Sequence, residues 1–192
     1  MKKETRILEV ELRTPEEESK MIIEGYAITF NSPATHGYTE IIDEKALDNC
    51  DMSDVPLKYN HEDSHLVIAR TRNKSLELKK DEKGLLIKAE LIDTQSNIDI
   101  YKSIKAGLID KMSFAFTVRE DSYDYDTDTR KILDIERLYD VSVVDIPFYD
   151  STSVYARNDN DDFLERRKEL RKEYEDKLAL QEAKNKLIEK LG

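Results

Sequence analysis

Residues 1–157 carry short runs of β-branched, aromatic and leucine side chains separated by turn-forming residues, a pattern that predicts strands. The clearest strand covers residues 21–30 and ends at Asn31-Ser-Pro33. Residues 76–80 and 85–91 predict a hairpin, because the linking Asp81-Glu-Lys-Gly84 contains a glycine free to adopt a positive φ. Further strands are predicted at 55–59, 66–71, 112–118 and 133–146, with an acidic loop at 121–129 between the last two.

Helix is predicted in three places. Residues 96–106 have cap candidates at Ser96 and Asn97, and residues 43–49 fit a helical turn capped by an aspartate. Residues 161–191 contain neither glycine nor proline and are rich in Glu, Lys, Arg and Leu, which predicts a charged amphipathic helix. The chain therefore divides into an α+β domain over residues 1–157, compatible with a barrel, and a charged helical tail over residues 158–192.

The composition of the 192-residue chain narrows the class of protein. The formal net charge is −11, whereas a general DNA- or RNA-binding protein needs a basic surface. No apolar run is long enough for a membrane span, and the N-terminal residues lack the apolar stretch of a signal peptide. Cys50 is the single cysteine, so the chain has no intramolecular disulfide and no cysteine-based zinc site. These features predict a soluble, intracellular protein with no cofactor and no metal.

Two polar positions are candidates for chemistry. His61 ends the predicted strand Val55-Pro-Leu-Lys-Tyr-Asn-His61 and enters a polar loop, where catalytic groups often lie on a rigid scaffold. In residues 112–118, alternation places large apolar side chains on one face and Ser113, with Ala and Thr, on the opposite, open face. Taken alone, the pattern favours a surface loop histidine for His61 and a small polar residue on a solvated face for Ser113.

A third candidate lies in the strand Arg137-Leu-Tyr-Asp-Val-Ser-Val-Val-Asp145. Simple alternation puts Asp140 and Ser142 on one face with Leu138 and Val144. A carboxylate within a run of Leu, Tyr and Val costs free energy unless it is paired or solvated. We therefore expect Asp140 to have a partner, which is either an imidazole or a lysine or arginine in a structural ion pair.

Six segments, in order, together resemble the prohead proteases of tailed bacteriophages over about residues 22–157. No single motif is decisive, but six in the same order and spacing make coincidence improbable. The matching segments are Glu24-Gly-Tyr-Ala-Ile-Thr-Phe30, Glu40-Ile-Ile-Asp-Glu-Lys-Ala-Leu47, Pro56-Leu-Lys-Tyr-Asn-His61, Asp81-Glu-Lys-Gly-Leu85, Gly107-Leu-Ile-Asp-Lys-Met-Ser-Phe-Ala-Phe116 and Leu138-Tyr-Asp-Val-Ser-Val-Val-Asp-Ile-Pro147.

This resemblance implies a serine endopeptidase with a fold similar to the herpesvirus maturational protease, an α+β fold with a mostly antiparallel β-barrel surrounded by short helices. It also implies that His61 is the general base, Ser113 the nucleophile and Asp140 the residue that orients His61. The family usually has glutamate where Asp140 stands. The herpesvirus relatives use a second histidine as the third member, but His36 and His65 lie in no matching segment.

The resemblance further implies what the protein acts on and where. The family cleaves capsid and scaffold proteins inside the immature shell, so the expected substrates are the phage major capsid protein or scaffold segments. The expected location is the prohead in the host cytoplasm, and self-cleavage and a homo-oligomer are expected; nucleic acid and membrane are not expected partners. A different class stays open, namely a catalytically inactive relative that acts as a capsid assembly or scaffolding factor.

Overall fold

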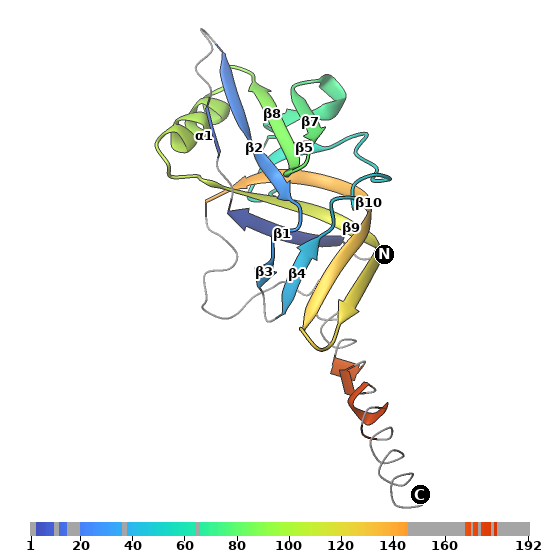
Figure 1. Cartoon of the computed structure of the whole chain (residues 1–192). Helices are drawn as coiled ribbons and strands as arrows, with labels where there is room; N and C mark the ends of the chain where they lie inside the picture. Colours follow the sequence, from blue (N-terminus) through green and yellow to red (C-terminus); the bar gives the residue numbers. More distant parts are fainter. Residues whose placement is uncertain are drawn as a thin grey trace, which may run out of the picture.

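Two β-sheets enclose one hydrophobic core in the computed structural model of the protein (Figure 1). The larger sheet has seven strands and the smaller sheet has three. The structure describes residues 3–9, 12–14, 20–35, 38–63, 66–145 and, in the C-terminal stretch, residues 168, 169, 171, 172, 174–177 and 179.

The larger sheet is built on its two longest strands, β9 (Lys111–Asp124) and β10 (Thr129–Val144), which pair antiparallel around a turn at residues 125–128. Outside β9, β1 (Lys3–Glu9) pairs antiparallel along residues 111–117. The strand β1 was not predicted from the sequence, and the loop predicted at residues 121–129 is wrong for most of its length, because the β9–β10 pairing continues there to Asp124 and resumes at Thr129.

The far side of β10 is long enough to hold two parallel partners one after the other. Residues 129–132 pair with β4 (Thr39–Ile42), and residues 141–143 pair with β5 (Pro56–Tyr59). Two-residue strands extend the sheet beyond these partners, and a short 3₁₀ helix follows the second of them: β3 (Ala34–Thr35), β6 (Ala69–Arg70) and η1 (Thr71–Asn73).

The smaller sheet is β2 (Met21–Thr29), β8 (Gly84–Leu91) and β7 (Leu76–Lys80), in that order. The predicted hairpin of β7 and β8 is confirmed. Gly84 is required for a different reason from the predicted positive φ: a Cβ on Gly84 would lie 1.9 Å from the Ile28 carbonyl oxygen. The close approach of β2 therefore leaves no room for a side chain there.

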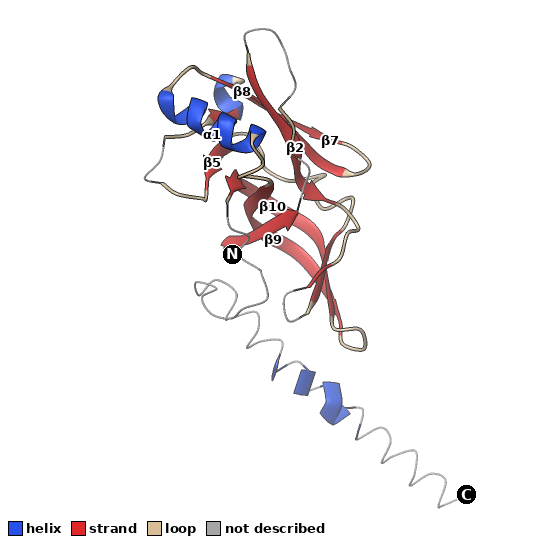
Figure 2. Cartoon of the chain, turned by 90° about the vertical axis from the view of Figure 1, so that its left-hand side faces the viewer, coloured by secondary structure: helices blue, strands red, loops and turns tan. Residues whose placement is uncertain are grey.

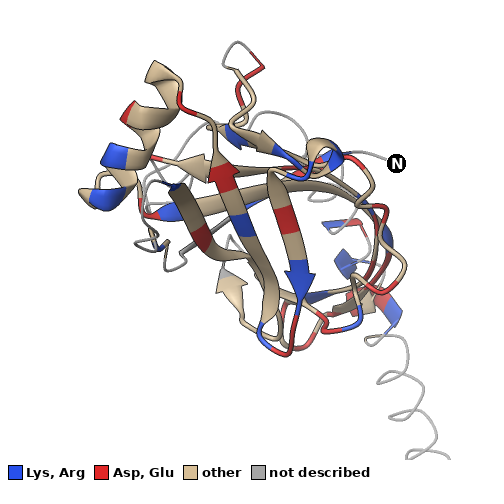
Figure 3. Ribbon diagram, turned by 90° about the horizontal axis from the view of Figure 1, so that it is seen from above, with Lys and Arg blue, Asp and Glu red and all other residues tan. Residues whose placement is uncertain are grey.

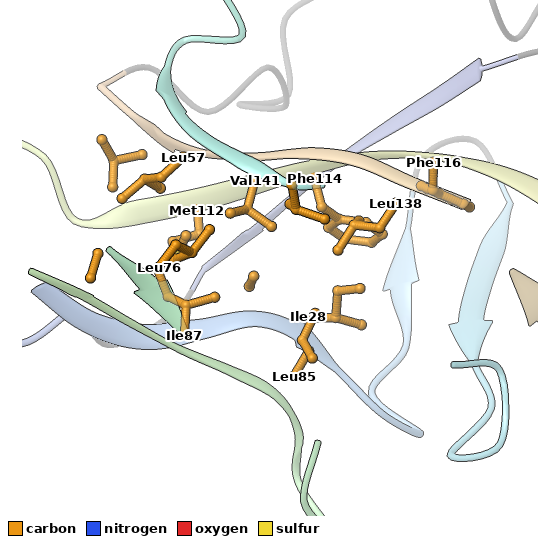
Figure 4. Close-up of a cluster of buried hydrophobic side chains, with 14 of the residues drawn as sticks. Ile28, Leu57, Leu76, Leu85, Ile87, Met112, Phe114, Phe116, Leu138 and Val141 are labelled. Carbon is orange, nitrogen blue, oxygen red and sulfur yellow. The ribbon is translucent and has the colours of Figure 1, made fainter. Parts of the chain in front are cut away.

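The core lies between the two sheets, as Figure 4 shows for side chains from β2, β7 and β8 on one side and β5, β9 and β10 on the other. Phe114 and Phe116 from β9 are completely buried, with ring centroids 5.0 Å apart. The face of β9 that carries these rings is the apolar face that alternation predicts. The opposite face of β9 is therefore left to carry polar side chains.

The predicted closed β-barrel surrounded by short helices is wrong. The strands form two separate sheets with edges, because β2, β8 and β7 pair with one another and with no strand of the larger sheet. Strands dominate, and α1 (Gln95–Lys105), the α-helix whose bounds the described residues define, lies at one end of the molecule (Figure 2). The rest of the fold is open and mixed rather than enclosed by helices.

Helix α1 matches the helix predicted at residues 96–106 within one residue. Its N-cap is Thr94 rather than Ser96 or Asn97, because the Thr94 side chain accepts a hydrogen bond from the Asn97 amide (3.4 Å). Gly107 follows the helix with φ 72°. Residues 44–49 form hydrogen-bonded turns rather than a helix, and the 66–71 strand shrinks to Ala69–Arg70.

The predicted C-terminal charged helix is not supported as an element of the fold. Most of residues 158–192 lie outside the described residues, and the described positions between 168 and 179 are helical in backbone but too scattered to form a bounded element of the fold. At one of these positions Tyr174 stacks on Tyr125 in the β9–β10 turn, with ring centroids 5.4 Å apart. No helix among the described residues is long and apolar enough to cross a membrane.

Replacing a core leucine should test the packing between the sheets. Leu85 in β8 is 0% exposed, so Leu85→Ala should lower the free energy of unfolding by about 2–5 kcal/mol. Leu108 is 70% exposed, so the matched variant Leu108→Ala should change it by less than about 0.5 kcal/mol. Urea denaturation measures both values, and equal losses in the two variants would contradict this arrangement of the core.

Candidate active site

His61 is placed by the parallel pairing of β5 with the end of β10. Tyr59, the last residue of β5, pairs with Val143, and the chain turns immediately afterwards. Asn60 and His61 both have positive φ, 50° and 57°, and the Glu62 amide donates to the Tyr59 carbonyl oxygen (3.0 Å). Two successive left-handed residues closed by this hydrogen bond are typical of a type I′ turn, which lifts the His61 side chain away from the strand.

The turn is held in place by Asp145, just after β10. The Asn60 side-chain amide donates to Asp145 Oδ1 (2.9 Å), and the Tyr59 hydroxyl donates to Asp145 Oδ2. The left-handed conformation costs a residue other than glycine about 1–2 kcal/mol, and the contacts of Asp145 with Tyr59 and Asn60 help to offset that cost in the turn. Strained backbone that the surroundings enforce is found most often at functional sites.

Ser113 and Asp140 are brought together by the register of β9 and β10. Ser113 pairs with Ser142, and Asp140 pairs with Ala115, so these side chains share the face of the sheet opposite the core. A register shift between Leu138 and Asp140 reverses the alternation at that point. Leu138 therefore packs in the core, and the sequence-based placement of Leu138 on the same face as Asp140 is wrong.

The three candidate residues form a continuous chain of contacts. His61 Nε2 lies 2.5 Å from Ser113 Oγ, and His61 Nδ1 lies against Asp140 Oδ1. Ser142, which sequence alternation groups with Asp140, donates to Asp140 Oδ1 (3.2 Å) and lies 3.2 Å from His61 Nδ1. The imidazole thus has a hydroxyl at one nitrogen and a carboxylate at the other, which is the arrangement of a Ser–His–Asp triad.

Asp140 is 1% exposed, and its charge depends on its partners. Burial alone would raise the pKa of Asp140, but the hydrogen bond and charge of His61, with the charge of Lys3, outweigh burial and lower it. Lys3 Nζ lies 3.2 Å from Asp140 Oδ2. The two kinds of partner expected for this carboxylate, an imidazole and a basic side chain, are therefore both present, and together they keep Asp140 ionised.

Strand β1 covers the candidate nucleophile. Ile7 of β1 pairs with Ser113, Ser113 is 0% exposed, and the Ser113 hydroxyl donates to the Arg6 carbonyl oxygen (2.7 Å). A hydroxyl has one proton, so the Arg6 carbonyl and His61 Nε2 compete for it. The side chain of His61, by contrast, is 22% exposed.

The remaining charges near the site are distributed in pairs. Figure 3 shows acidic and basic residues interspersed over strands and loops rather than gathered by sign. Arg70 at the end of β6 and Arg72 in η1 both face Asp54, at 2.5 Å and 3.6 Å. Within the described parts of the chain, no group of three His, Cys, Asp or Glu side chains converges to hold a metal ion. His36 and His65 lie outside the described residues.

A serine, a histidine and a carboxylate in contact across one face of a sheet are the constellation that serine hydrolases use. The family model described as Caudovirus prohead serine protease matches residues 8–166, most of the chain. The chain therefore belongs to the caudovirus prohead serine protease family, a family of proteases of the phage capsid precursor, and the predicted resemblance is confirmed.

Two other comparisons add little. The solved structure of the bacteriophage T4 capsid assembly protease, gp21, is 12% identical, with a TM-score of 0.45, over 73% of this chain and 98% of that chain. No curated protein matches the chain.

The residues that support and cover the site have no clear signal in the sequence. Asn60 and Asp145 hold the turn that carries His61. The left-handed conformation of this turn could not be predicted, because the turn contains no glycine. In strand β1, only the β-branched residues Thr5 and Ile7 favour an extended conformation, and charged residues surround them. Pairing with a long neighbouring strand, rather than intrinsic propensity, makes this segment extended.

The lowered pKa of Asp140 predicts how stability depends on pH. A carboxylate with a lower pKa in the folded state stabilises the protein above its unfolded-state pKa of about 3.9 and loses that contribution as the pH falls through the folded-state value. The unfolding free energy of the wild type should therefore exceed that of Asp140→Asn most near neutral pH, with the difference shrinking below about pH 4.

Chemical denaturation of both proteins from neutral to acidic pH measures this difference. The exposed residue Asp93 supplies the control, because Asp93→Asn should stay within about 0.5 kcal/mol of the wild type. A difference between wild type and Asp140→Asn that is independent of pH would contradict an ionised, charge-paired Asp140.

Proposed function

We propose that this protein is a serine endopeptidase in which Ser113 is the nucleophile, His61 the general base and Asp140 the residue that orients His61. The observation that carries the proposal is the double contact of His61, with Nε2 at Ser113 Oγ (2.5 Å) and Nδ1 at Asp140. The three residues come from β9, from the turn after β5 and from β10, so the contact depends on tertiary structure and not on local sequence.

Each residue type meets a chemical need. A serine hydroxyl attacks a peptide carbonyl only when a base takes its proton, and imidazole accepts that proton and later returns it to the leaving amine. The ionised Asp140 fixes the tautomer that leaves Nε2 free to accept, and it stabilises the imidazolium that forms. Aspartate suffices here, where the family usually has glutamate, because the turn at residues 60–61 brings His61 within reach of β10.

The proposed substrates are capsid and scaffold proteins of the phage, cleaved inside the prohead, and the chain itself. Self-cleavage is supported by β1, whose backbone already lies against Ser113. The second candidate function, an inactive relative that serves as an assembly factor, is favoured by the complete burial of Ser113. The two functions predict different behaviour of β1. In the protease β1 leaves the site or is cut there, whereas in the inactive assembly factor β1 stays in place. A homo-oligomer is part of the proposal.

We also propose that the chain divides near residue 157 into the catalytic domain and a tail that binds scaffold segments. Tyr174 and Arg171 of the tail contact Tyr125 and Asp128 in the β9–β10 turn, at a distance from the triad along both strands. Deletion of the residues after Asn158 should therefore abolish incorporation into proheads and leave Ser113-dependent peptide cleavage intact. Co-purification with proheads measures the first effect, and normal incorporation of the shortened chain would reject this role.

Removal of the proposed nucleophile should abolish proteolysis. Ser113→Ala and His61→Ala should each lower kcat/KM by about 10⁴-fold or more, because triad members act as a unit. Asp140→Asn should retain the fold near neutral pH but lose about 10⁴-fold in kcat through the wrong tautomer of His61. Intact-mass analysis over time, at increasing protein concentration and with the phage capsid protein added, measures cleavage.

The control for this experiment is Ser122→Ala, an exposed serine on the same strand, which should cleave like the wild type. Identical products from the wild type and Ser113→Ala would point to a contaminating protease. No Ser113-dependent product, with the capsid protein present, would favour the inactive assembly factor.

A further inference from the structure

Strand β1 lies on the body of the protein in the way a peptide substrate adds to a sheet edge. It pairs antiparallel with the strand that carries Ser113, from Lys3 opposite Thr117 to Glu9 opposite Lys111 (Figure 1). Within this stretch the Arg6 carbonyl oxygen accepts a hydrogen bond from the Ser113 hydroxyl (2.7 Å). The carbonyl group next to the nucleophile is thus that of Arg6, and the peptide bond it belongs to joins Arg6 to Ile7.

The side chains of Glu4 and Arg6 leave β1 on the face opposite Ser113, where two buried charged residues receive them. Glu40 contacts the Arg6 guanidinium with both carboxylate oxygens, at Nε and at Nη2 (2.7 Å). Arg130 binds the Glu4 carboxylate with Nη1 (2.7 Å) and Nη2 (3.0 Å). Each contact is a two-pronged pairing of guanidinium and carboxylate, which fixes geometry as well as charge.

We propose that Glu40 and Arg130 are specificity-determining residues that select the sequence Glu-x-Arg, and that the enzyme cuts after the arginine. The inference rests on the proposed function and names the substrate class of that same site. Glu4-Thr5-Arg6 is the bound example, and Arg6–Ile7 is the bond to be cut in the chain's own N-terminal segment.

The receptor for this sequence is part of the folded body. Glu40 in β4 and Arg130 in β10 are register partners, 4% and 3% exposed, and their side chains also contact each other (3.1 Å). Asp121 completes the group with an ion pair to Arg130 (2.6 Å). The three charged side chains therefore belong to β4, β9 and β10 and not to β1.

Selectivity follows from the cost of leaving a buried charge without its partner. A substrate with glutamine in place of arginine would leave Glu40 short of one hydrogen-bonded cation, and truncating one member of such a buried pair generally lowers affinity by a factor of about 30 or more. The Arg6 guanidinium also lies over the Phe116 ring, 5.6 Å from its centroid, which favours a planar cation at this position.

The proposed step is a balanced acyl transfer. His61 Nε2 takes the Ser113 proton as Ser113 Oγ forms a bond to the Arg6 carbonyl carbon, and the bond from that carbon to the Ile7 nitrogen breaks. The proton passes from His61 to the new Ile7 amine. Water then hydrolyses the ester, with His61 as base again, and restores Ser113.

The distribution of Glu-x-Arg in the sequence agrees with self-trimming. The triplet occurs at residues 4–6, 11–13, 165–167 and 169–171, and nowhere between residues 14 and 164. Every instance therefore lies outside the stretch from β2 to β10. Together with β1, that stretch forms the two sheets. Cleavage at all four sites would remove terminal segments and leave that stretch uncut.

The test uses the full-length chain as enzyme and a quenched fluorescent peptide with the sequence of residues 2–11 as substrate. Three matched peptides are compared with it. One replaces the arginine at position 6 by glutamine, one replaces the glutamate at position 4 by glutamine, and one exchanges these two residues. We expect kcat/KM to fall at least about 30-fold for the arginine replacement and by a smaller factor for the glutamate replacement. The exchanged peptide should not be cut.

Substitution of the receptor should remove this preference. Glu40→Gln should lower the ratio of kcat/KM for the arginine peptide over the glutamine peptide to less than about 5, whereas the exposed control Glu77→Gln should keep the wild-type ratio. The ratio compares two peptides on one enzyme, so a variant that is merely less stable lowers both rates and leaves the ratio unchanged. In intact-mass analysis the wild-type chain should yield a product that begins at Ile7, and Arg6→Gln should not.

Two results separate the two proposals. Ser113-dependent cleavage with equal rates for the arginine and glutamine peptides, or self-cleavage at other bonds only, would overturn the selection of Glu-x-Arg and leave the proposed endopeptidase standing. The absence of Ser113-dependent cleavage of any peptide, of the chain and of the capsid protein would overturn both.

Discussion

The antiparallel pairing of β9 with β10 is the constraint on which the rest of the structure depends. Its register sets Ser113 opposite Ser142 and Asp140 opposite Ala115, and the irregularity after Leu138 turns the carboxylate away from the core. The same two strands supply the edges on which β1, β4 and β5 form. A slip of one residue would send Ser113 into the core and Phe114 out of it, so packing of the apolar face also protects the geometry of the site.

Strand β1 has two effects that oppose each other in a protease. It satisfies the backbone groups of the outer edge of β9, which would otherwise be an open sheet edge, and it buries Ser113. It also places Lys3 beside Asp140, so the charge of the candidate triad is set partly by a segment that a substrate would have to displace. The described structure is thus that of a site already occupied by the chain's own residues.

The sequence was sufficient to predict most strands, the β7–β8 hairpin and α1, and to single out three residues that the structure brings into contact, because those features have local patterns or a family resemblance. It was not sufficient to decide between a barrel and two sheets. That choice depends on whether β2 pairs with the larger sheet, and no local pattern encodes this pairing. It also failed at β1, where charged residues hide an extended segment, and at the face of Leu138, where a bulge breaks simple alternation. In each failure, contacts between distant strands override the local signal.

The chemistry of the contacts that hold β1 suits a segment that must both bind and leave. Lys3, Glu4 and Arg6 make ion pairs to the body, and Glu4 and Arg6 carry opposite charges, so their departure leaves the net charge of the group formed with Glu40, Arg130 and Asp121 unchanged. Buried ion pairs are generally no more stabilising than apolar contacts of the same size, but they are far more selective, because a mismatched partner leaves a charge unpaired. An apolar anchor would bind many extended peptides, whereas paired charges at fixed positions restrict the edge of β9 to a strand that carries the matching pair.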